Sequence, residues 1–364
     1  MQNKNFNNTY NIRPKKKKKG KSAGLGVFLL VIAGVWFISW KLFSGVGDFS
    51  IGLDLGDADK KRADNKEIFS EARDYPVAVM FDNHPDSQAY LTGLSDALIV
   101  YEALAEGDST RFMGIFSGDV EIEKIGPVRS SRPYFVEIAS GWSAFYLHAG
   151  GSPEALELIP TTEVIDLNEI SGLGIRYFWR DDIVPRPHNL FTSSDLIALG
   201  LEDFELDELP DEKLLWQWEK KKGKSKKEGD EGYVSSVYVD FSEGVEFDVG
   251  YEHNQDKNVY MREMGGIRHR DYGSGDQFAA TNIIIQRIPW EGYYPSGYGR
   301  ISLDLVGDGE MLLFQNGELI QGTWEKDSRD DQTEFFDEDG DRIELVRGQT
   351  WIEVLPGSRV VSYE

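Results

Sequence analysis

The chain has 364 residues, of which 63 are acidic and 39 basic, and it contains no cysteine. The first 21 residues carry eight basic side chains and no acid, so the other 343 residues hold 31 basic and 63 acidic side chains, a balance of −32. A body of this charge excludes a protein that binds nucleic acid through its surface field, and the lack of cysteine excludes disulfides, thiolate metal sites, a cysteine nucleophile and a lipid-bearing cysteine.

The amino-terminal segment predicts a membrane anchor. Residues 1–21 form a basic stub, and 19 uncharged residues follow, from Ser22 to Trp40. At about 1.5 Å per residue, such a run can cross a hydrocarbon core of about 30 Å. We therefore predict a transmembrane helix at residues 22–43, a cytoplasmic stub, and an extracytoplasmic remainder at the cell membrane. A cleaved signal peptide is the alternative, but the long basic run and the lack of a small-residue cleavage site argue against it.

Composition divides the remaining chain. Residues 44–74 are acidic and predict a solvated stalk. A charge-rich stretch at residues 207–232 predicts a linker or loop between a first domain at residues 75–206 and a second at residues 233–356, with a short tail after it at residues 357–364. The expected fold class is α+β: a membrane-anchored chain with a mixed α/β first domain and a mostly antiparallel β second domain.

Two apolar runs of the first domain predict buried strands. Val77–Phe81 predicts a strand buried on both faces, which ends in the polar stretch Asp82–Pro85 that includes Asn83. Trp142–Leu147 predicts another strand. His148 would then lie at its carboxyl end, where open α/β sheets place their ligands.

A hairpin is predicted between these two strands. Leu98–Glu106 and Thr110–Phe116 flank a Gly-Asp-Ser turn. A helix is the alternative for the first of these runs. The hairpin would bring Glu102 or Glu106 toward Arg111.

A helix start follows the hairpin. Ser130 or Ser131 suits the N-cap of a helix whose first turn holds Pro133. Arg129 and Arg132 would then lie at the helix amino terminus, which is a favourable place for a phosphate or carboxylate. The alternative is that both arginines pair with acids of the same domain.

A second helix start comes after the predicted strand that ends at His148. Ser152 and Pro153 would open this helix, and the preceding Gly150-Gly151 forms either an anion-binding nest or a plain turn. A further polar group precedes a third predicted helix near Leu196; it comprises Arg180, His188 and Asn189.

The candidate ligand-binding residues are Asn83, Glu102, Arg111, Arg129, Ser130, Arg132, His148, Gly150, Ser152, Arg180, His188 and Asn189. Six of them lie where a predicted element ends and a loop begins, and function concentrates at such positions. These six are Asn83, Arg129, Arg132, His148, Arg180 and His188.

Several of these residues belong to motifs that resemble a known family. The motifs are Pro76-Val77-Ala78-Val79-Met80, Val100-Tyr101-Glu102, Thr110-Arg111-Phe112, Gly126-Pro127-Val128-Arg129-Ser130-Ser131-Arg132, His148-Ala149-Gly150-Gly151-Ser152-Pro153, Pro187-His188-Asn189-Leu190 and, near the end, Gly348-Gln349-Thr350-Trp351-Ile352. They are similar to those of the YerB-like family, two-domain bacterial envelope proteins often described as lipoproteins. The resemblance covers about residues 75 to 356 and implies a mixed α and β architecture without an assigned activity. This chain has no cysteine to acylate, so a spanning helix would provide the tether.

Alternating apolar residues dominate the second domain and predict antiparallel strands. Three dipeptides predict short hairpin turns, namely Asp308-Gly309, Asn316-Gly317 and Asp339-Gly340.

Three functional hypotheses remain, and the sequence favours a binding or scaffold module over an enzyme. Arginines at the helix starts would bind an anionic envelope ligand, such as a carboxylate- or phosphate-bearing polymer, or an acidic protein partner. The alternative is an envelope hydrolase that uses His148 or His188 as base, with Ser152 or Ser130. The sequence contains no Gly-x-Ser-x-Gly elbow, and no acid lies at a spacing that would orient either histidine.

A metal site is the weakest of the three hypotheses. Its candidate ligands would be Asp82, His84, His148 and His188, but no local ligand spacing supports it. We therefore expect neither a metal nor a cofactor.

Overall fold

A computed structural model describes residues 75–364, apart from residues 108, 207–215, 220–223, 242 and 295–296. The predicted stub, membrane helix and stalk all lie within residues 1–74, outside the described residues. Among the described residues, no helix is long and apolar enough to cross a membrane.

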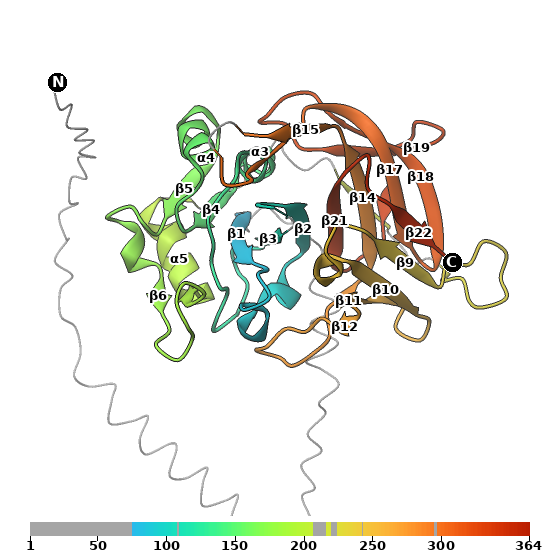
Figure 1. Ribbon diagram of the computed structural model, residues 1–364, viewed down its shortest axis with the longest axis horizontal. Coiled ribbons are helices and arrows are strands. Elements are labelled where there is room, and N and C mark those ends of the chain that lie inside the picture. The colour runs from blue at the N-terminus through green and yellow to red at the C-terminus, as the bar shows by residue number, and fades with distance from the viewer. Residues whose placement is uncertain (1–74, 108, 207–215, 220–223, 242, 295–296) are drawn as a thin grey trace, which may run out of the picture. The chain divides into compact units, whose positions relative to one another are not determined.

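Most of the regular secondary structure in the described chain is β, and its main element is a ten-stranded sheet (Figure 1). In chain order its strands are β1 (Val77–Asp82), β2 (Ile99–Leu104), β3 (Thr110–Phe116), β4 (Phe145–His148), β5 (Ile165–Asn168), β14 (Asn282–Ile288), β17 (Gly307–Gln315), β18 (Glu318–Lys326), β19 (Glu334–Asp337) and β21 (Thr350–Pro356).

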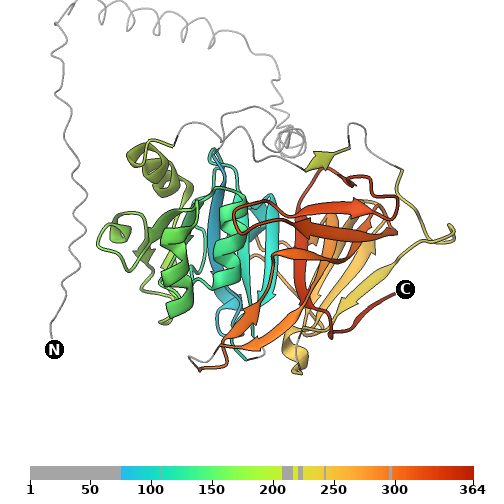
Figure 2. The same cartoon turned by 90° about the horizontal axis from the view of Figure 1, so that it is seen from above.

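The order of strands in this sheet is β19-β18-β17-β14-β21-β2-β3-β1-β4-β5. The parallel pair β2–β21 joins strands of the first predicted domain to strands of the second, so the sheet is continuous across both. In Figure 2 the blue and cyan strands lie in the middle, with green segments on one side and orange and red strands on the other.

A second sheet has the order β12-β11-β10-β9-β22, with β13 paired to β11. Its strands are β9 (Ser236–Val239), β10 (Val249–Asn254), β11 (Val259–Met264), β12 (Ile267–Arg268), β13 (Ala279–Ala280) and β22 (Val361–Tyr363). Three short pairs complete the β-structure: β15 (Trp290–Tyr293) with β16 (Ile301–Leu303), β8 (Gln217–Trp218) with β20 (Glu344–Leu345), and β6 (Trp179–Arg180) with β7 (Leu190–Phe191).

The α-helices of the described residues come from the first predicted domain. They are α3 (Pro133–Gly141), α4 (Pro153–Leu158) and α5 (Ser194–Asp203). Short 3₁₀ segments lie at Gln88–Tyr90, Leu94–Asp96, Ile159–Thr161, Gly174–Arg176 and Val245–Phe247. The predicted fold class is confirmed as far as its coarse description, a mostly β chain with few helices and two domains.

The strand predictions for the first domain agree well with the structure. β1 is buried at all six positions and pairs in parallel with β4. β2 and β3 form the predicted antiparallel hairpin, so the helical alternative for its first run is wrong apart from the single 3₁₀ turn at Leu94–Asp96. The strand predicted at Trp142–Leu147 is β4, and it begins only at Phe145. The preceding residues belong to the end of α3, which extends to Gly141 and has Trp142 as its C-cap.

One of the predicted turns is wrong and two are found. Asn316 and Gly317 join β17 to β18 with φ of 54° and 71°, the left-handed values that a type I′ turn requires. Asp339 and Gly340 likewise form a turn after β19. Asp308-Gly309 instead lies within β17, because Gly309 makes room for the ring of Trp324 on β18.

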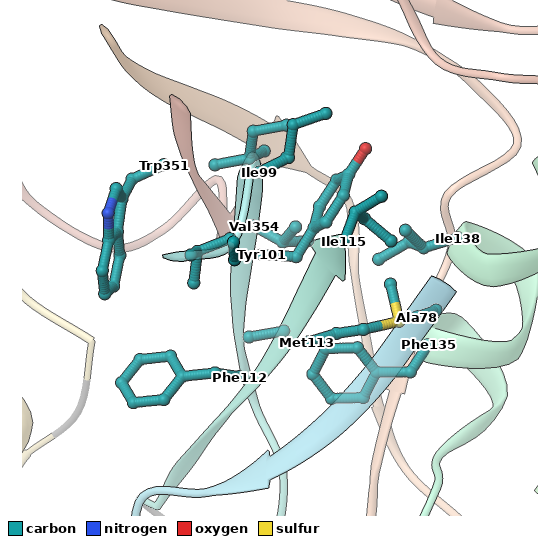
Figure 3. Packing of buried hydrophobic residues seen from close by; sticks show 14 of the residues in the cluster. Ala78, Ile99, Tyr101, Phe112, Met113, Ile115, Phe135, Ile138, Trp351 and Val354 are labelled. Atoms are coloured by element: carbon teal, nitrogen blue, oxygen red, sulfur yellow. The ribbon is translucent and has the colours of Figure 1, made fainter. Parts of the chain in front are cut away.

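The core lies on both faces of the large sheet. Phe135 and Ile138 of α3 cover one face, where Met113 of β3 is buried (Figure 3). On the other side Phe112 packs edge-on against Trp351 of β21, with ring centroids 5.6 Å apart. Burying each large side chain of this kind stabilises the fold by roughly 1.5–3 kcal/mol.

Candidate functional site

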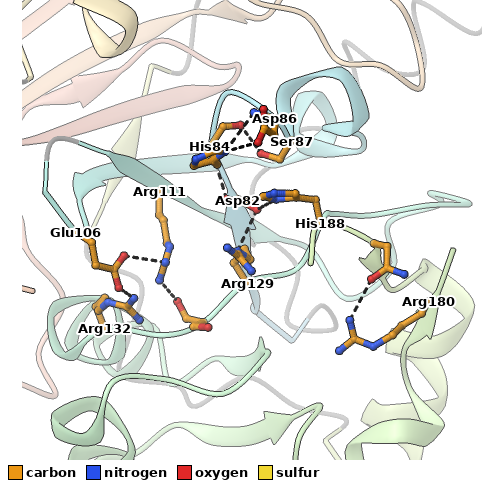
Figure 4. A network of polar contacts seen from close by, with 12 residues as sticks. Asp82, His84, Asp86, Ser87, Glu106, Arg111, Arg129, Arg132, Arg180 and His188 are labelled. Carbon is orange, nitrogen blue, oxygen red and sulfur yellow. Dashed lines mark hydrogen bonds and ion pairs between the residues drawn. The ribbon is translucent and has the colours of Figure 1, made fainter. Parts of the chain in front are cut away.

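Asp82 is the centre of a polar cluster at the carboxyl end of β1 (Figure 4). It lies opposite Arg111 in the β1–β3 register. Its Oδ2 is 2.5 Å from Nδ1 of His188 and 3.0 Å from Nε of Arg129. Its Oδ1 accepts the main-chain N–H of His84 at 3.1 Å. One nearly buried carboxylate thus holds three separate segments of the chain together.

The segment before Arg129 runs beside β1 as an extra extended strand. The main-chain N–H of Arg129 bonds to the carbonyl of Met80 at 3.1 Å, and that of Asp82 to the carbonyl of Pro127 at 3.0 Å. Gly126 has a φ of +144°, and an added Cβ would lie 2.9 Å from the carbonyl oxygen of Leu190. Only glycine allows the backbone to approach this closely, and that approach delivers Arg129 to Asp82.

Arg129 keeps part of its guanidinium group available. Its side chain is 24% exposed, and Nε forms an ion pair with Asp82 without the geometry of a hydrogen bond. Among the described residues, its two terminal nitrogens have no hydrogen-bond or ion-pair partner. These two donors form the fork that binds a carboxylate or phosphate in two places.

Arg111 and Arg132 share a different acid, Glu106. Nη2 of Arg111 donates to Glu106 at 2.8 Å, and Arg132 pairs with the other oxygen of the same carboxylate. Both arginines also donate to main-chain carbonyls. Nη1 of Arg111 donates to the carbonyl of Ser130, and Nη1 of Arg132 donates to the carbonyl of Ser131. Arg111 and Arg132 therefore pair with an acid of the same domain, as the alternative to a ligand site predicted. Arg129 also pairs with an acid, Asp82, but its two terminal nitrogens stay available.

The predicted N-cap of this helix is wrong. Arg132 itself occupies the N-cap position of α3, and its side chain makes no capping bond. Pro133 fixes the start of the helix, so both serines lie before it. Ser131 instead accepts the hydroxyl of Tyr146 at 2.6 Å. Ser130 contributes its carbonyl to Arg111.

The charges around these arginines do not balance fully. Burial lowers the pKa of Arg111, Arg129 and Arg132, more than Asp82 and the neighbouring tyrosines raise it. Within this cluster, three guanidinium groups pair with the two carboxylates of Asp82 and Glu106. Arg300 and Glu154 add one charge of each sign near Arg132. The cluster is therefore a locally cationic site in an otherwise acidic protein.

His148 lies on β4 at a fully buried position, and both of its ring nitrogens are occupied. Nδ1 is 2.7 Å from the carbonyl oxygen of Gly150, and Nε2 is 2.7 Å from Oδ1 of Asp166. Ser152 accepts the main-chain N–H of Ala155 and is the N-cap of α4, as predicted. Neither side chain is placed as a base–nucleophile pair, so this geometry offers no support for a hydrolase.

Of the two alternatives for the Gly150-Gly151 turn, the structure favours the plain turn over the anion nest. Gly150 has a φ of +65°, and its N–H donates to Oδ1 of Asn168 at 2.8 Å. The turn is further tied to the arginine segment, because the N–H of Ser131 donates to the carbonyl of Gly150. Its role is to join two loops, since the Gly150 N–H that would bind an anion is already in use.

The remaining predicted residues lie in two other groups. Arg180 donates to Asn189 at 3.1 Å and pairs with Glu169 at 3.0 Å. Asn83 and Glu102 point to the other side of the sheet, where Nδ2 of Asn83 lies 3.3 Å from Oε1 of Glu102. Of the twelve candidates, Arg111, Arg129, Ser130, Arg132 and His188 contribute to the cluster around Asp82 and Glu106. The turn that holds His148, Gly150 and Ser152 is bonded to the arginine segment through its main chain. The other four candidates, Asn83, Glu102, Arg180 and Asn189, lie elsewhere.

Sequence reasoning missed a fully buried arginine, Arg262, that joins the two sheets. Nη2 of Arg262, on β11, pairs with Glu102 at 2.5 Å, and its Nη1 lies 3.2 Å from Glu353 on β21. All three side chains are fully buried. Burial acts to lower the pKa of Arg262, but the two acids and Tyr251 outweigh it and raise that pKa. No local sequence motif indicates this group, because its three charged side chains meet only in the folded structure.

Comparison with known proteins identifies the family. Residues 64–207 match the family described as "Protein of unknown function (DUF3048) N-terminal domain", and residues 237–352 match its C-terminal domain. The chain belongs to the DUF3048 family. The YerB-like resemblance is confirmed, because the chain is 34% identical over 285 residues to "Putative lipoprotein YerB" of Bacillus subtilis (strain 168), covering 77% of this chain and 81% of that one.

A solved structure of the same DUF3048 relative supports the fold. The crystal structure of the YerB protein from Bacillus subtilis superposes with a TM-score of 0.67 at 32% identity. The match covers 80% of this chain and 94% of the relative. The DUF3048 description assigns no biochemical activity to either domain.

Proposed function

We propose that this DUF3048 protein is a membrane-anchored, extracytoplasmic binding module that holds an anionic envelope polymer at Arg129. The observation that carries the proposal is the guanidinium group of Arg129, whose two terminal nitrogens have no partner among the described residues. Asp82 holds the Nε side of that group and so presents the other two nitrogens as a fixed fork. A carboxylate or phosphate of a cell-wall polymer is the matching chemistry.

The surroundings strengthen this proposal. Arg111 and Arg132 add two further positive charges against one shared acid, Glu106. Burial lowers the pKa of all three arginines, so a bound anion would supply the counter-charge that the protein leaves missing. The net charge of −32 outside the basic stub would keep other polyanions away from the rest of the surface.

The proposed location rests on the amino-terminal residues and on the relative. The basic stub and the apolar run at residues 22–43 support a single-pass anchor with a cytoplasmic amino terminus. The Bacillus subtilis relative is named a lipoprotein, which is likewise consistent with tethering at the outer side of a membrane. Alkylating a cysteine introduced at Glu364 with a membrane-impermeant reagent in intact cells tests the orientation; labelling only after lysis would overturn it.

A sedimentation experiment tests the binding role. The purified full-length chain in detergent would be mixed with the isolated cell-wall fraction and centrifuged. Arg129→Gln should reduce the co-sedimented amount at least severalfold, whereas Arg176→Gln removes an exposed, acid-paired arginine and should leave it unchanged. Equal retention of both variants and the wild type would overturn the proposal.

A further inference from the structure

A second cluster lies on the other side of Asp82, outside the arginine group. His84, Asp86 and His188 each place one potential metal-ligand atom within 4.8 Å of the others. The rings of His84 and His188 are stacked, with centroids 5.4 Å apart (Figure 4). Two imidazoles and one carboxylate are a ligand set of catalytic zinc and other first-row metal sites.

Asp82 orients the ring of His188 through a hydrogen bond, as acidic residues do for histidine ligands in known metal sites. Nδ1 of His188 is 2.5 Å from Oδ2 of Asp82, which fixes the ring and leaves Nε2 on its far side. Nε2 has no hydrogen-bond partner among the described residues, although His188 is only 8% exposed. A metal-bound histidine almost always donates its other ring N–H to a carboxylate or carbonyl in this manner.

The turn after β1 positions the other two ligands. The N–H of His84 donates to Asp82, and the N–H of Ser87 donates to the carbonyl of His84 at 2.7 Å. Nδ1 of His84 accepts the N–H of Asp86 at 3.2 Å, so the two side chains lie on the same side of the turn. The backbone of the turn is therefore fixed by the fold before any ligand arrives.

The distances between the potential ligand atoms are close to those found around a tetrahedral metal ion. Nδ1 of His84 lies 3.7 Å from Oδ2 of Asp86. It would have to release the main-chain N–H of Asp86 before binding a metal, because its one lone pair cannot serve both. Ligand atoms about 2.1 Å from a tetrahedral Zn²⁺ lie about 3.4 Å from one another. The side chains of His84 and Asp86 are 48% and 78% exposed, so they can rotate inward by the small remaining distance.

We propose that His84, Asp86 and His188 bind one Zn²⁺ or a similar first-row divalent ion, with Asp82 as the residue that orients His188. Three protein ligands leave one position for water or for an anion. Ca²⁺ and Mg²⁺ prefer oxygen ligands and suit this set poorly. The carboxylate of Asp86 offsets part of the charge of the ion, while that of Asp82 is shared between His188 and Arg129.

This site does not depend on the polymer-binding role. Arg129→Gln should abolish polymer binding and leave Zn²⁺ binding intact, because Arg129 supplies no metal ligand. The failure of one proposal therefore does not imply the failure of the other.

Calorimetric titration of the full-length chain, free of any histidine tag and stripped by chelator, tests the proposal with Zn²⁺ as the probe. The wild type should bind one Zn²⁺ per chain. His84→Ala and Asp86→Asn should each weaken binding at least tenfold, and both side chains are exposed, so folding should be retained. Asp82→Asn should weaken it on the order of 10–100-fold, as is usual for an orienting partner.

Matched controls exist in the second sheet. His253→Ala removes a histidine that bonds to Asn258 and Tyr233, and Asp256→Asn removes an exposed acid nearby. Both should leave Zn²⁺ affinity within twofold of the wild type. The visible absorption of bound Co²⁺ should appear in the wild type and be lost in His84→Ala. Absence of Zn²⁺ binding by the wild type, or equal affinity of His84→Ala and His253→Ala, would overturn the proposal.

Discussion

Glu102 and Glu353 lie directly opposite each other on the parallel strands β2 and β21, both fully buried, and Arg262 pairs with both. Two like charges at adjacent buried positions repel strongly, and one arginine carries only one compensating charge. Burial first, and then the charge of Glu102, raise the pKa of Glu353 to about 8. The join between the two predicted domains is thus a buried ionic group whose charge depends on pH.

Stability should fall with rising pH because of Glu353. Its folded-state pKa of about 8 lies above its ordinary value of 4.5, so between these values the folded protein binds more protons than the unfolded chain. The free energy of unfolding therefore decreases as pH rises through this window, by roughly 1 kcal/mol per pH unit for one such group. Glu353→Gln stays neutral and should remove this dependence.

Urea unfolding of both proteins at several pH values measures this effect. The advantage of Glu353→Gln over the wild type should grow steadily from about pH 5 to about pH 8. Glu310→Gln changes an exposed glutamate and serves as the control. A constant difference between Glu353→Gln and wild type across this range would contradict the raised pKa.

Removing Arg262 should be among the most damaging single changes. Arg262→Leu leaves two buried acids without a counter-ion, and breaking a buried pair in this way costs about 3–5 kcal/mol. Arg268→Leu, on an exposed position of β12, should change stability by about 0.5 kcal/mol or less. Denaturant unfolding distinguishes the two, and near-equal midpoints would show that the Arg262 group does not hold the sheets together.

Gly126 should tolerate no side chain. Gly126→Ala places a Cβ at a φ of +144° and 2.8 Å from the main-chain nitrogen of Val128, so it should destabilise the fold by more than about 1 kcal/mol. Gly172→Ala meets no atom within 4 Å and should be nearly neutral. Thermal unfolding compares them. If the two variants melt together, the close approach at Gly126 is not required.

Ser152 should act as a helix cap and not as a nucleophile. Ser152→Ala removes the bond to Ala155 and should lower stability by about 1 kcal/mol. Binding to the cell-wall fraction should be unchanged, because Ser152 lies outside the arginine cluster. Loss of binding by a fully folded Ser152→Ala protein would place this serine in the functional site.

Local patterns predict the elements of the first domain because each carries its own signal. The apolar run at β1, the Gly-Asp-Ser turn before β3 and the serine before Pro153 all act within a few residues. The sequence does not reveal that β21 inserts beside β2. That pairing depends on side chains more than 200 residues apart in sequence, which local periodicity cannot detect.

The candidate site was predictable only in part, for a similar reason. Arg111, Arg129 and Arg132 were found because they lie at the ends of elements, and the structure brings them together. Their acidic partners lie in other segments, so the sequence could not show that Glu106 serves two arginines. Asp82, His84 and His188 are already candidate metal ligands in the sequence, whereas Asp86 reads as an ordinary loop acid. Only the fold brings His188 to the turn that holds the other three.

The most direct test of the central claim is the affinity of the full-length chain for a purified anionic cell-wall polymer, measured by equilibrium titration for the wild type, Arg129→Gln and Arg176→Gln. If Arg129 holds the polymer, binding is saturable and Arg129→Gln weakens it at least tenfold, about 1.4 kcal/mol, whereas Arg176→Gln binds as the wild type does. Equal affinity of the Arg129→Gln and wild-type proteins would contradict it.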